Sequence, residues 1–244
     1  MTAQQFQHLA EQGYNRIPVS RQILADTETP VSCYQKLAAG PYSYLFESVQ
    51  GGEKWGRYSM IGLPCRTVIR IVGHTVHIEH DGQQRESFAV DDPLQYVRDY
   101  RAQFRAAELP GLPAFQGGLV GYFGYDSVRY VEPRLAGHAP PDTLHTADIL
   151  LMLSDEVVVF DNLNGVLSLI VMADPAMPDA YASAQKRLDQ LQQQLAERCL
   201  AMPAINLQAG SSADALPETA FVSGFSQPDF EAAVDKIKHY VLDG

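Results

Sequence analysis

The sequence predicts an α+β fold in which antiparallel sheets pack with helices. Apolar runs at 149–153, 157–160 and 166–172 follow one another with short connections, and short connections join antiparallel strands. Long segments at 92–104 and 179–200 carry apolar residues at helical spacing, which gives each helix one apolar face. Locally connected strands beside amphipathic helices favour helix-covered antiparallel sheets and argue against a doubly wound parallel sheet.

Composition limits the class of protein. The chain has 244 residues, of which 46% are hydrophobic, so it can bury the core of one large domain or two small ones. Its net charge is −11 without a basic stripe, which argues against nucleic-acid binding. Its longest apolar runs are too short to cross a membrane, and the N-terminus lacks the features of a secretion signal. The three cysteines, Cys33, Cys65 and Cys199, are widely spaced, so we expect free thiols in a reduced, cytoplasmic protein.

The N-terminal part of the chain predicts two short helices followed by a strand. Thr2 can cap a first helix that stops at Gly13. Thr29 followed by Pro30 can start a second helix. Alternating apolar and polar residues then predict a strand at 42–49.

More strands and a helix are expected in the middle of the chain. Strands are predicted near 58–61 and 67–72, and a turn at Gly73 can pair the second of them with 74–80 as a hairpin. An amphipathic helix then opens at Asp92.

The histidines at 74–80 and the glycines at 117–124 could suggest a metal site and a phosphate site, but their spacing supports neither. His74, His77 and His80 alternate in direction along a strand, so they cannot converge on one metal ion, and a solvated hairpin face is expected. The glycines between 117 and 124 do not match the phosphate-binding GxGxxG motif. We interpret them as places where the backbones of packed sheets approach closely.

The strands and the long helix that follow complete the first predicted domain. A polar, proline-containing surface loop is expected at 132–145. The runs at 149–153 and 157–160 are predicted to pair as a hairpin around Ser154 and Asp155. The helix at 179–200 is predicted to pack on a sheet, with a coiled-coil partner helix as the alternative.

The C-terminal part predicts a change of domain. Residues 201–224 are rich in small residues and proline without a period, and we interpret them as a linker. Ser226 and Asp229 can cap a last helix over 225–244, whose apolar face needs something to pack on. The predicted organisation is therefore a domain at 1–200, a linker at 201–224 and the first helix of a further domain at 225–244.

The stretch 42–62 holds the candidate binding residues. A strand ends on Glu47 and Ser48, a glycine-containing loop follows, and Arg57 stands where the next strand begins. A carboxylate accepts hydrogen bonds from an ammonium group, while a hydroxyl and a guanidinium donate to a carboxylate. These groups therefore suit a free amino acid. The alternative interpretation is a strand, a tight loop and a solvated charge pair.

Several motifs together resemble a known family. The motifs at 45–48, 51–53, 56–59 and 117–126 resemble, in this order, the N-terminal region of anthranilate synthase component I, a chorismate-utilising enzyme. The resemblance implies that the sheets form part of an αββα sandwich. It also implies that this region is a regulatory and interface domain that binds the feedback inhibitor L-tryptophan, with inhibitor-binding residues Ser48, Glu47 and Arg57.

The resemblance further implies what the parent protein does. It would convert chorismate and ammonia or glutamine to anthranilate and pyruvate, with a glutamine amidotransferase subunit (component II) as partner. The Mg2+ ligands and catalytic residues would lie in the chorismate-binding domain that the helix at 225–244 opens. We expect no catalytic and no metal-binding residue in the 244 residues. The alternatives are the same region of aminodeoxychorismate or isochorismate synthase, and a non-catalytic amino-acid-sensing or assembly module.

Overall fold

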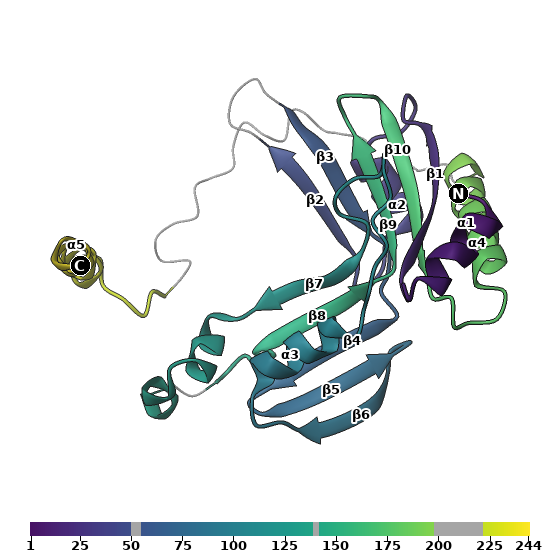
Figure 1. Ribbon diagram of the computed structural model, residues 1–244. Coiled ribbons are helices and arrows are strands. Elements are labelled where there is room, and N and C mark those ends of the chain that lie inside the picture. The colour runs from purple at the N-terminus through teal and green to yellow at the C-terminus, as the bar shows by residue number, and fades with distance from the viewer. Residues whose placement is uncertain (50–54, 139–141, 198–221) are drawn as a thin grey trace, which may run out of the picture. The chain divides into compact units, whose positions relative to one another are not determined.

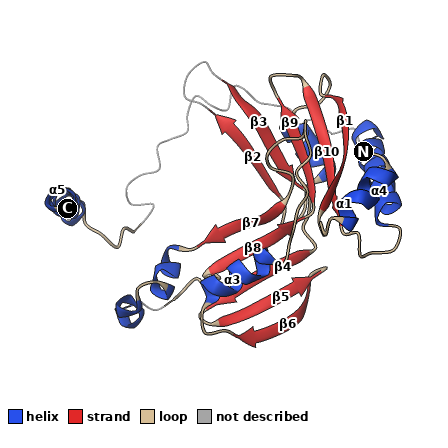
Figure 2. Ribbon diagram, viewed as in Figure 1, coloured by secondary structure: helices blue, strands red, loops and turns tan. Residues whose placement is uncertain are grey.

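The computed structural model describes residues 1–49, 55–138, 142–197 and 222–244. The chain divides into two compact units, residues 1–200 and 201–244, which are described separately. The first unit contains two antiparallel sheets of five strands each (Figures 1 and 2). This confirms the predicted α+β class.

The first sheet carries the candidate site. Its edge strands are the first and second strands of the chain, and every neighbouring pair in it is antiparallel. In spatial order it consists of β1 (Ile17–Leu24), β10 (Val166–Ala173), β9 (Glu156–Asp161), β3 (Trp55–Gly62) and β2 (Tyr44–Val49).

The second sheet is built from the middle of the chain. Its strands are also antiparallel throughout. In spatial order it consists of β6 (Gln83–Ala89), β5 (Thr75–His80), β4 (Thr67–Val72), β8 (Ile149–Ser154) and β7 (Gly118–Phe123).

Helices cover one face of each sheet. The first sheet packs against α1 (Ala3–Glu11), α2 (Pro30–Leu37) and α4 (Ala180–Glu197), and the second packs against α3 (Pro93–Ala102) (Figure 1). The opposite faces form smaller apolar clusters, and Phe115 packs against both of them. The layers therefore follow the predicted αββα order.

Local signals account for where the helices begin. Thr2 and Thr29 are the N-caps of α1 and α2, and each takes part in a capping box. The Asp92 carboxylate accepts hydrogen bonds from two backbone N–H groups of α3, and Pro93 occupies the first turn. These helix starts confirm the sequence predictions.

The long helix α4 packs on the first sheet, as predicted. Its apolar stripe places Leu188 and Leu191 among the fully buried side chains of the core. A bidentate ion pair also joins Arg187 to Glu156 of β9, with nitrogen–oxygen distances of 2.8 and 2.7 Å. The predicted last turn of this helix, including Cys199, lies outside the described residues.

The predicted hairpin around Ser154 and Asp155 is wrong. β8 and β9 follow each other in sequence but belong to different sheets, because Asp155 alone separates the end of one from the start of the other. A tight hairpin needs two turn residues, usually with glycine or asparagine at positive φ, and this junction has neither. The chain instead crosses from one sheet to the other.

Two strands were absent from the sequence prediction. β1 contains Pro18, which is unusual in a strand, but β1 is an edge strand and an edge position tolerates the missing N–H group. β6 is also an edge strand, and its exposed polar residues hide the period-two pattern. In both cases position at a sheet edge explains the atypical composition.

Two glycines, one just before β7 and one within it, lie where a side chain would clash with neighbouring strands. A Cβ atom on Gly121 would lie 1.9 Å from the carbonyl oxygen of Leu150, in the neighbouring strand β8. A Cβ atom on Gly117 would lie 2.7 Å from the carbonyl oxygen of Ser154. Gly121 therefore fits β7 against β8 within one sheet, whereas a Cβ atom on Gly117 would also lie 3.0 Å from the Met172 side chain of β10 in the other sheet.

The three histidines make separate contacts. His80 contacts Thr67 through its Nδ1 atom at 3.0 Å, while His77 contacts Ser87 at 3.0 Å. His74 lies in the β4–β5 turn and contacts the carbonyl oxygen of Val90.

Two short 3-10 helices follow β7, and the second lies in the predicted loop at 132–145. β7 stops at Phe123, and η1 (Tyr125–Tyr130) and η2 (Pro133–His138) follow. The Tyr130 hydroxyl donates to the Asp148 carboxylate at 2.8 Å, which ties η1 to the second sheet.

The second unit contains one described helix, α5 (Gln227–Asp243). Ser226 is its N-cap, and its hydroxyl accepts a hydrogen bond from the backbone N–H of Asp229. This confirms the predicted helix start. Residues 201–221, most of the predicted linker, lie outside the described residues.

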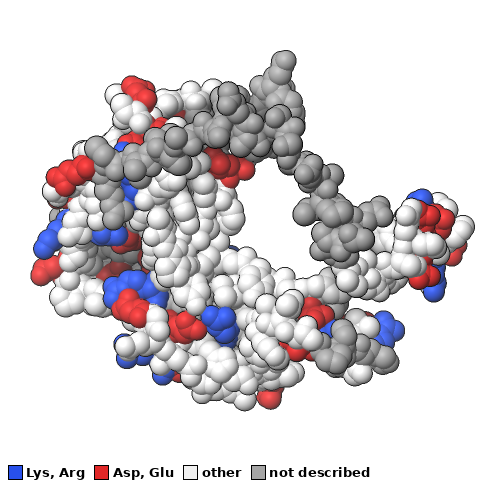
Figure 3. Space-filling model, turned by 180° about the vertical axis from the view of Figure 1, so that it is seen from behind, with Lys and Arg blue, Asp and Glu red and all other residues white. Residues whose placement is uncertain are grey.

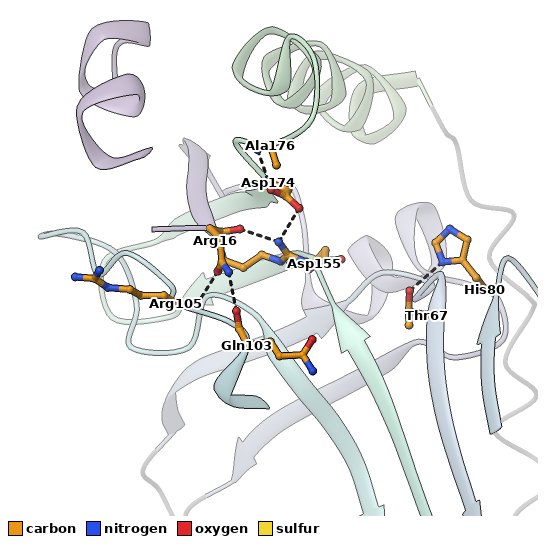
Figure 4. A network of polar contacts seen from close by, with 9 residues as sticks. Arg16, Thr67, His80, Gln103, Arg105, Asp155, Asp174 and Ala176 are labelled. Atoms are coloured by element: carbon orange, nitrogen blue, oxygen red, sulfur yellow. Dashed lines mark hydrogen bonds and ion pairs between the residues drawn. The ribbon is translucent and has the colours of Figure 1, made fainter. Parts of the chain in front are cut away.

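A polar network holds the junction between the sheets (Figure 4). Arg16, just before β1, lies 3.0 Å from the carboxylate of Asp174 and 4.0 Å from that of Asp155. Its guanidinium also lies 4.7 Å from the ring centroid of Phe104. Burial raises the pKa of Asp155 to about 6, and the nearby carboxylates of Glu156 and Asp174 add to this, whereas Arg16 and Arg66 oppose it.

We predict that Asp155→Asn stabilises the fold at neutral pH. Because the folded pKa lies above the ordinary value of 3.8, the wild-type protein loses stability as the pH rises through about 6. The side chain is 45% exposed, so solvent screening reduces the effect to about 1 kcal/mol. Urea denaturation at pH 7.5 should show this gain, and denaturation at pH 4 should show little difference. Asp26→Asn, at an exposed position outside this network, is the control; equal pH dependence in all three proteins would contradict the prediction.

Candidate functional site

The candidate site lies where β2 and β3 meet at one end of the first sheet. The pairing of the two strands runs regularly from Tyr44 to Glu47, which is opposite Ser59, and then becomes irregular between Glu47 and Val49. A β-bulge re-aims the side chains next to it and is frequent beside functional sites. Because β2 is an edge strand, its outer side has no neighbouring strand in the described sheet.

Ser48 lies in this irregularity and packs directly on Gly56. A Cβ atom on Gly56 would lie 2.1 Å from the carbonyl oxygen of Ser48 and 2.2 Å from its Cβ atom. No side chain larger than hydrogen fits there unless the strands move. Gly56 is therefore required for the position of Ser48, which explains the glycine in the motif at 56–59.

Arg57 is held by an acidic residue of β9. Its Nε and Nη2 atoms donate to the two carboxylate oxygens of Asp161 at 3.3 and 3.0 Å. Its guanidinium lies 4.8 Å from the ring centroid of Tyr58. The hydrogen bond to Arg57 is the main cause that lowers the pKa of Asp161 below its ordinary value.

Asn162 holds the backbone of the same stretch. Its side-chain amide donates to the carbonyl oxygen of Gly56 at 3.0 Å, and its backbone N–H donates to the carbonyl oxygen of Arg57 at 2.8 Å. The turn after β9 thus contacts the beginning of β3 through both side chain and backbone.

Glu47 is exposed and leaves the strand on a different face from Ser48. Strand alternation puts Glu47 on the face of Leu45, which packs toward the helix-covered core. Within the described part of the chain its carboxylate makes no hydrogen bond or ion pair. A ligand that contacts both Glu47 and Ser48 must therefore approach from the free edge of β2, where both faces can be reached.

Ser48 and Arg57 both lie near this two-strand corner, but no described contact joins either of them to the other or to Glu47, because Arg57 turns toward Asp161 of β9, on the side of β3 away from β2. The structure also adds two residues that the sequence analysis missed. The sequence prediction ended a strand at Phe160 and gave neither Asp161 nor Asn162 a role in the site. They lie about a hundred positions from Arg57 and Gly56 in the sequence. The asparagines and glycine at 162–165 predict a turn, but they do not predict its contact with β3. The predicted loop residues 50–54 lie outside the described residues.

The described residues offer no metal site and no membrane span. No group of three or more His, Cys, Asp or Glu side chains gathers in the described ranges in a way that could hold a metal ion. No helix among them is both long and apolar enough to cross a bilayer. On the face seen in Figure 3, the basic side chains of the described residues are interspersed with acidic ones.

Comparison with known proteins places these features in a family. The sequence model described as "chorismate binding enzyme" matches residues 7–244, which is nearly the whole chain. The chain belongs to the chorismate-binding enzyme family.

Individual relatives of this chorismate-binding enzyme chain carry a more specific name. Anthranilate synthase component 1 of Pseudomonas aeruginosa is 52% identical over 244 residues, which cover 100% of this chain and 49% of that protein. The protein of the same name from Neisseria gonorrhoeae is 46% identical over 247 residues, covering 100% of this chain and 48% of the relative. The resemblance seen in the motifs is therefore confirmed, and the chain spans about half the length of the relatives it matches.

A solved structure is similar to this chain at a lower sequence identity than these relatives. It is anthranilate synthase component I from Streptococcus pneumoniae TIGR4, with 24% sequence identity and a TM-score of 0.48. The match covers 72% of this chain and 37% of that one.

Proposed function

We propose that this chain is the part of an anthranilate synthase component I that carries the tryptophan feedback site and part of the subunit interface. The parent, a cytoplasmic lyase, would convert chorismate and ammonia to anthranilate and pyruvate in tryptophan biosynthesis. A glutamine amidotransferase subunit would supply the ammonia. The relatives that match the whole chain at about half their length support this assignment.

The corner formed by β2 and β3 is the observation that carries the proposed inhibitor site. Ser48 sits in a strand irregularity against Gly56, and the Arg57 guanidinium stands at the start of the neighbouring strand. A hydroxyl and a guanidinium suit the carboxylate of an amino acid, and the carboxylate of Glu47 suits its ammonium group. The exposure of Glu47 and Ser48 leaves both groups open to a ligand.

Inhibition would act by changing how this part of the protein is arranged relative to the chorismate-binding part. Tryptophan would favour an arrangement in which chorismate binds poorly. A coupling free energy of about 1–3 kcal/mol is enough, and by reciprocity chorismate would weaken tryptophan binding to the same extent. The Mg2+ ligands of the reaction would lie in the chorismate-binding part.

The test is a product assay on the full-length protein. We expect anthranilate, detected by its fluorescence, from chorismate and an ammonium salt in the presence of Mg2+, and we expect L-tryptophan to inhibit its formation. Formation of aminodeoxychorismate or isochorismate instead would overturn the assigned reaction. Tryptophan binding without consumption of chorismate would favour a non-catalytic sensor. Anthranilate formation that tryptophan leaves unchanged would overturn the feedback site alone.

A further inference from the structure

The Arg57–Asp161 pair has a geometry that orients the guanidinium. Asp161 engages Nε on one oxygen and Nη2 on the other, which is a fork with two nearly parallel hydrogen bonds. Such a fork fixes the plane of the guanidinium as well as its position. The Nη1 atom forms no hydrogen bond with any described residue, so it remains available to a ligand.

Asp161 is itself held firmly. Its carboxylate also accepts hydrogen bonds from the backbone N–H groups of Leu163 and Asn164, at 3.2 and 3.3 Å, and from the Asn164 side chain at 2.8 Å. Its side chain is only 16% exposed, whereas that of Arg57 is 52% exposed. A fixed carboxylate beneath an exposed guanidinium is the arrangement expected when one residue orients another toward solvent or a ligand.

The next residue, Asn162, holds the backbone of β3 on either side of the Gly56–Arg57 peptide bond. Asn162 binds the carbonyl oxygens of Gly56 and Arg57, so the turn after β9 fixes the stretch of β3 that contacts Ser48. One turn therefore positions both a cation and, through Gly56, a hydroxyl.

We propose that Asp161 is a positioning residue of the amino-acid site: it orients Arg57 so that the free Nη1 edge of the guanidinium binds the ligand's carboxylate. This inference rests on the proposed inhibitor site. It adds the residue that would make that site prefer a ligand with a carboxylate. Without Asp161, Arg57 keeps its charge but loses its fixed orientation. Ligand binding must then order the side chain, and this loss of conformational entropy weakens the affinity.

The first test compares ligands with and without the carboxylate charge. Calorimetry on the full-length protein should show that Asp161→Asn weakens L-tryptophan binding about five- to fiftyfold. Binding of L-tryptophanamide, which lacks the carboxylate, should change much less. Asp161→Ser is the second variant, because a serine hydroxyl can still accept from the turn N–H groups but cannot form the fork. A loss that is equal for both ligands would indicate a merely structural role and overturn the inference.

The second test is a double-mutant cycle with Arg57→Gln. If Asp161 acts through Arg57, Asp161→Asn should have little further effect on tryptophan affinity once the guanidinium is gone. Additive losses would overturn the inference.

A matched control exists on the second sheet. Asp81 holds Arg66 by the same fork, with both distances 2.8 Å, and lies in the turn between β5 and β6. Asp81→Asn should leave tryptophan binding unchanged. Wild-type protein that does not bind tryptophan would overturn the proposed inhibitor site itself, whereas binding that Asp161→Asn and Asp161→Ser leave unaltered would overturn only the role of Asp161.

Discussion

Replacing Ser48 by phenylalanine should relieve tryptophan inhibition of the full-length protein while leaving anthranilate formation largely intact. Ser48 lies in the irregular end of β2, directly against Gly56, so a large ring cannot turn inward and must occupy the space beside the strand. The ring would fill space proposed for the ligand and remove the Ser48 hydroxyl, so the concentration of tryptophan needed for half-inhibition should rise about 10- to 100-fold, which corresponds to about 1.4–2.8 kcal/mol of binding free energy. Because no catalytic residue is assigned near β2, the kcat and KM for chorismate should change little.

The measurement is anthranilate formation at increasing tryptophan concentrations. Ser87→Phe is a matched control, because Ser87 is an exposed residue of the edge strand β6 in the other sheet. It should leave inhibition unchanged. Superimposable inhibition curves for wild type and Ser48→Phe would remove Ser48 from the site.

Replacing Gly121 by alanine should strongly destabilise the first unit. The new Cβ atom would lie 1.9 Å from the carbonyl oxygen of Leu150, 2.9 Å from its carbonyl carbon and 3.0 Å from the Cα atom of Leu151. All three are backbone atoms of β8, so no side-chain rotation relieves the clash and β7 must separate from β8. We expect a loss of about 2–5 kcal/mol in the free energy of unfolding.

Denaturant unfolding of this chain measures the effect. Gly137→Ala is the control, since Gly137 lies in η2 and an added Cβ atom would meet nothing within 4 Å. We expect its effect to stay within about 0.5 kcal/mol. Equal stability of the two variants would show that β7 contributes little to the fold.

Most of the helices could be predicted because their determinants are local. A threonine or aspartate cap defines the starts of α1, α2 and α3, and α2 and α3 also have a proline in the first turn, whatever the helix packs on. Likewise, the apolar spacing of α4 is enough to predict a helix with one buried face. The strands with apolar cores, such as β9 and β10, were predictable for the same reason.

Strand pairing was less predictable because it depends on distant residues. β8 and β9 are consecutive, yet β8 pairs with β4 and β7, and β9 pairs with β3 and β10. The buried hydrogen bond between Tyr44 and Ser154, at 2.8 Å, joins residues 110 positions apart at the corner where the sheets meet. Hydrophobic alternation identifies a strand but carries no information about which strand it will join.

By itself the sequence determined the α+β class, the positions of the capped helices and, through the motifs around Ser48 and Gly121, the family. Only the tertiary structure decided that Gly56 supports Ser48 and that Asp161 holds Arg57. The physical reason is that helix caps and apolar periods arise from interactions within a few residues. The fork between Arg57 and Asp161 forms only after β9 has paired with β3, across 104 positions of sequence.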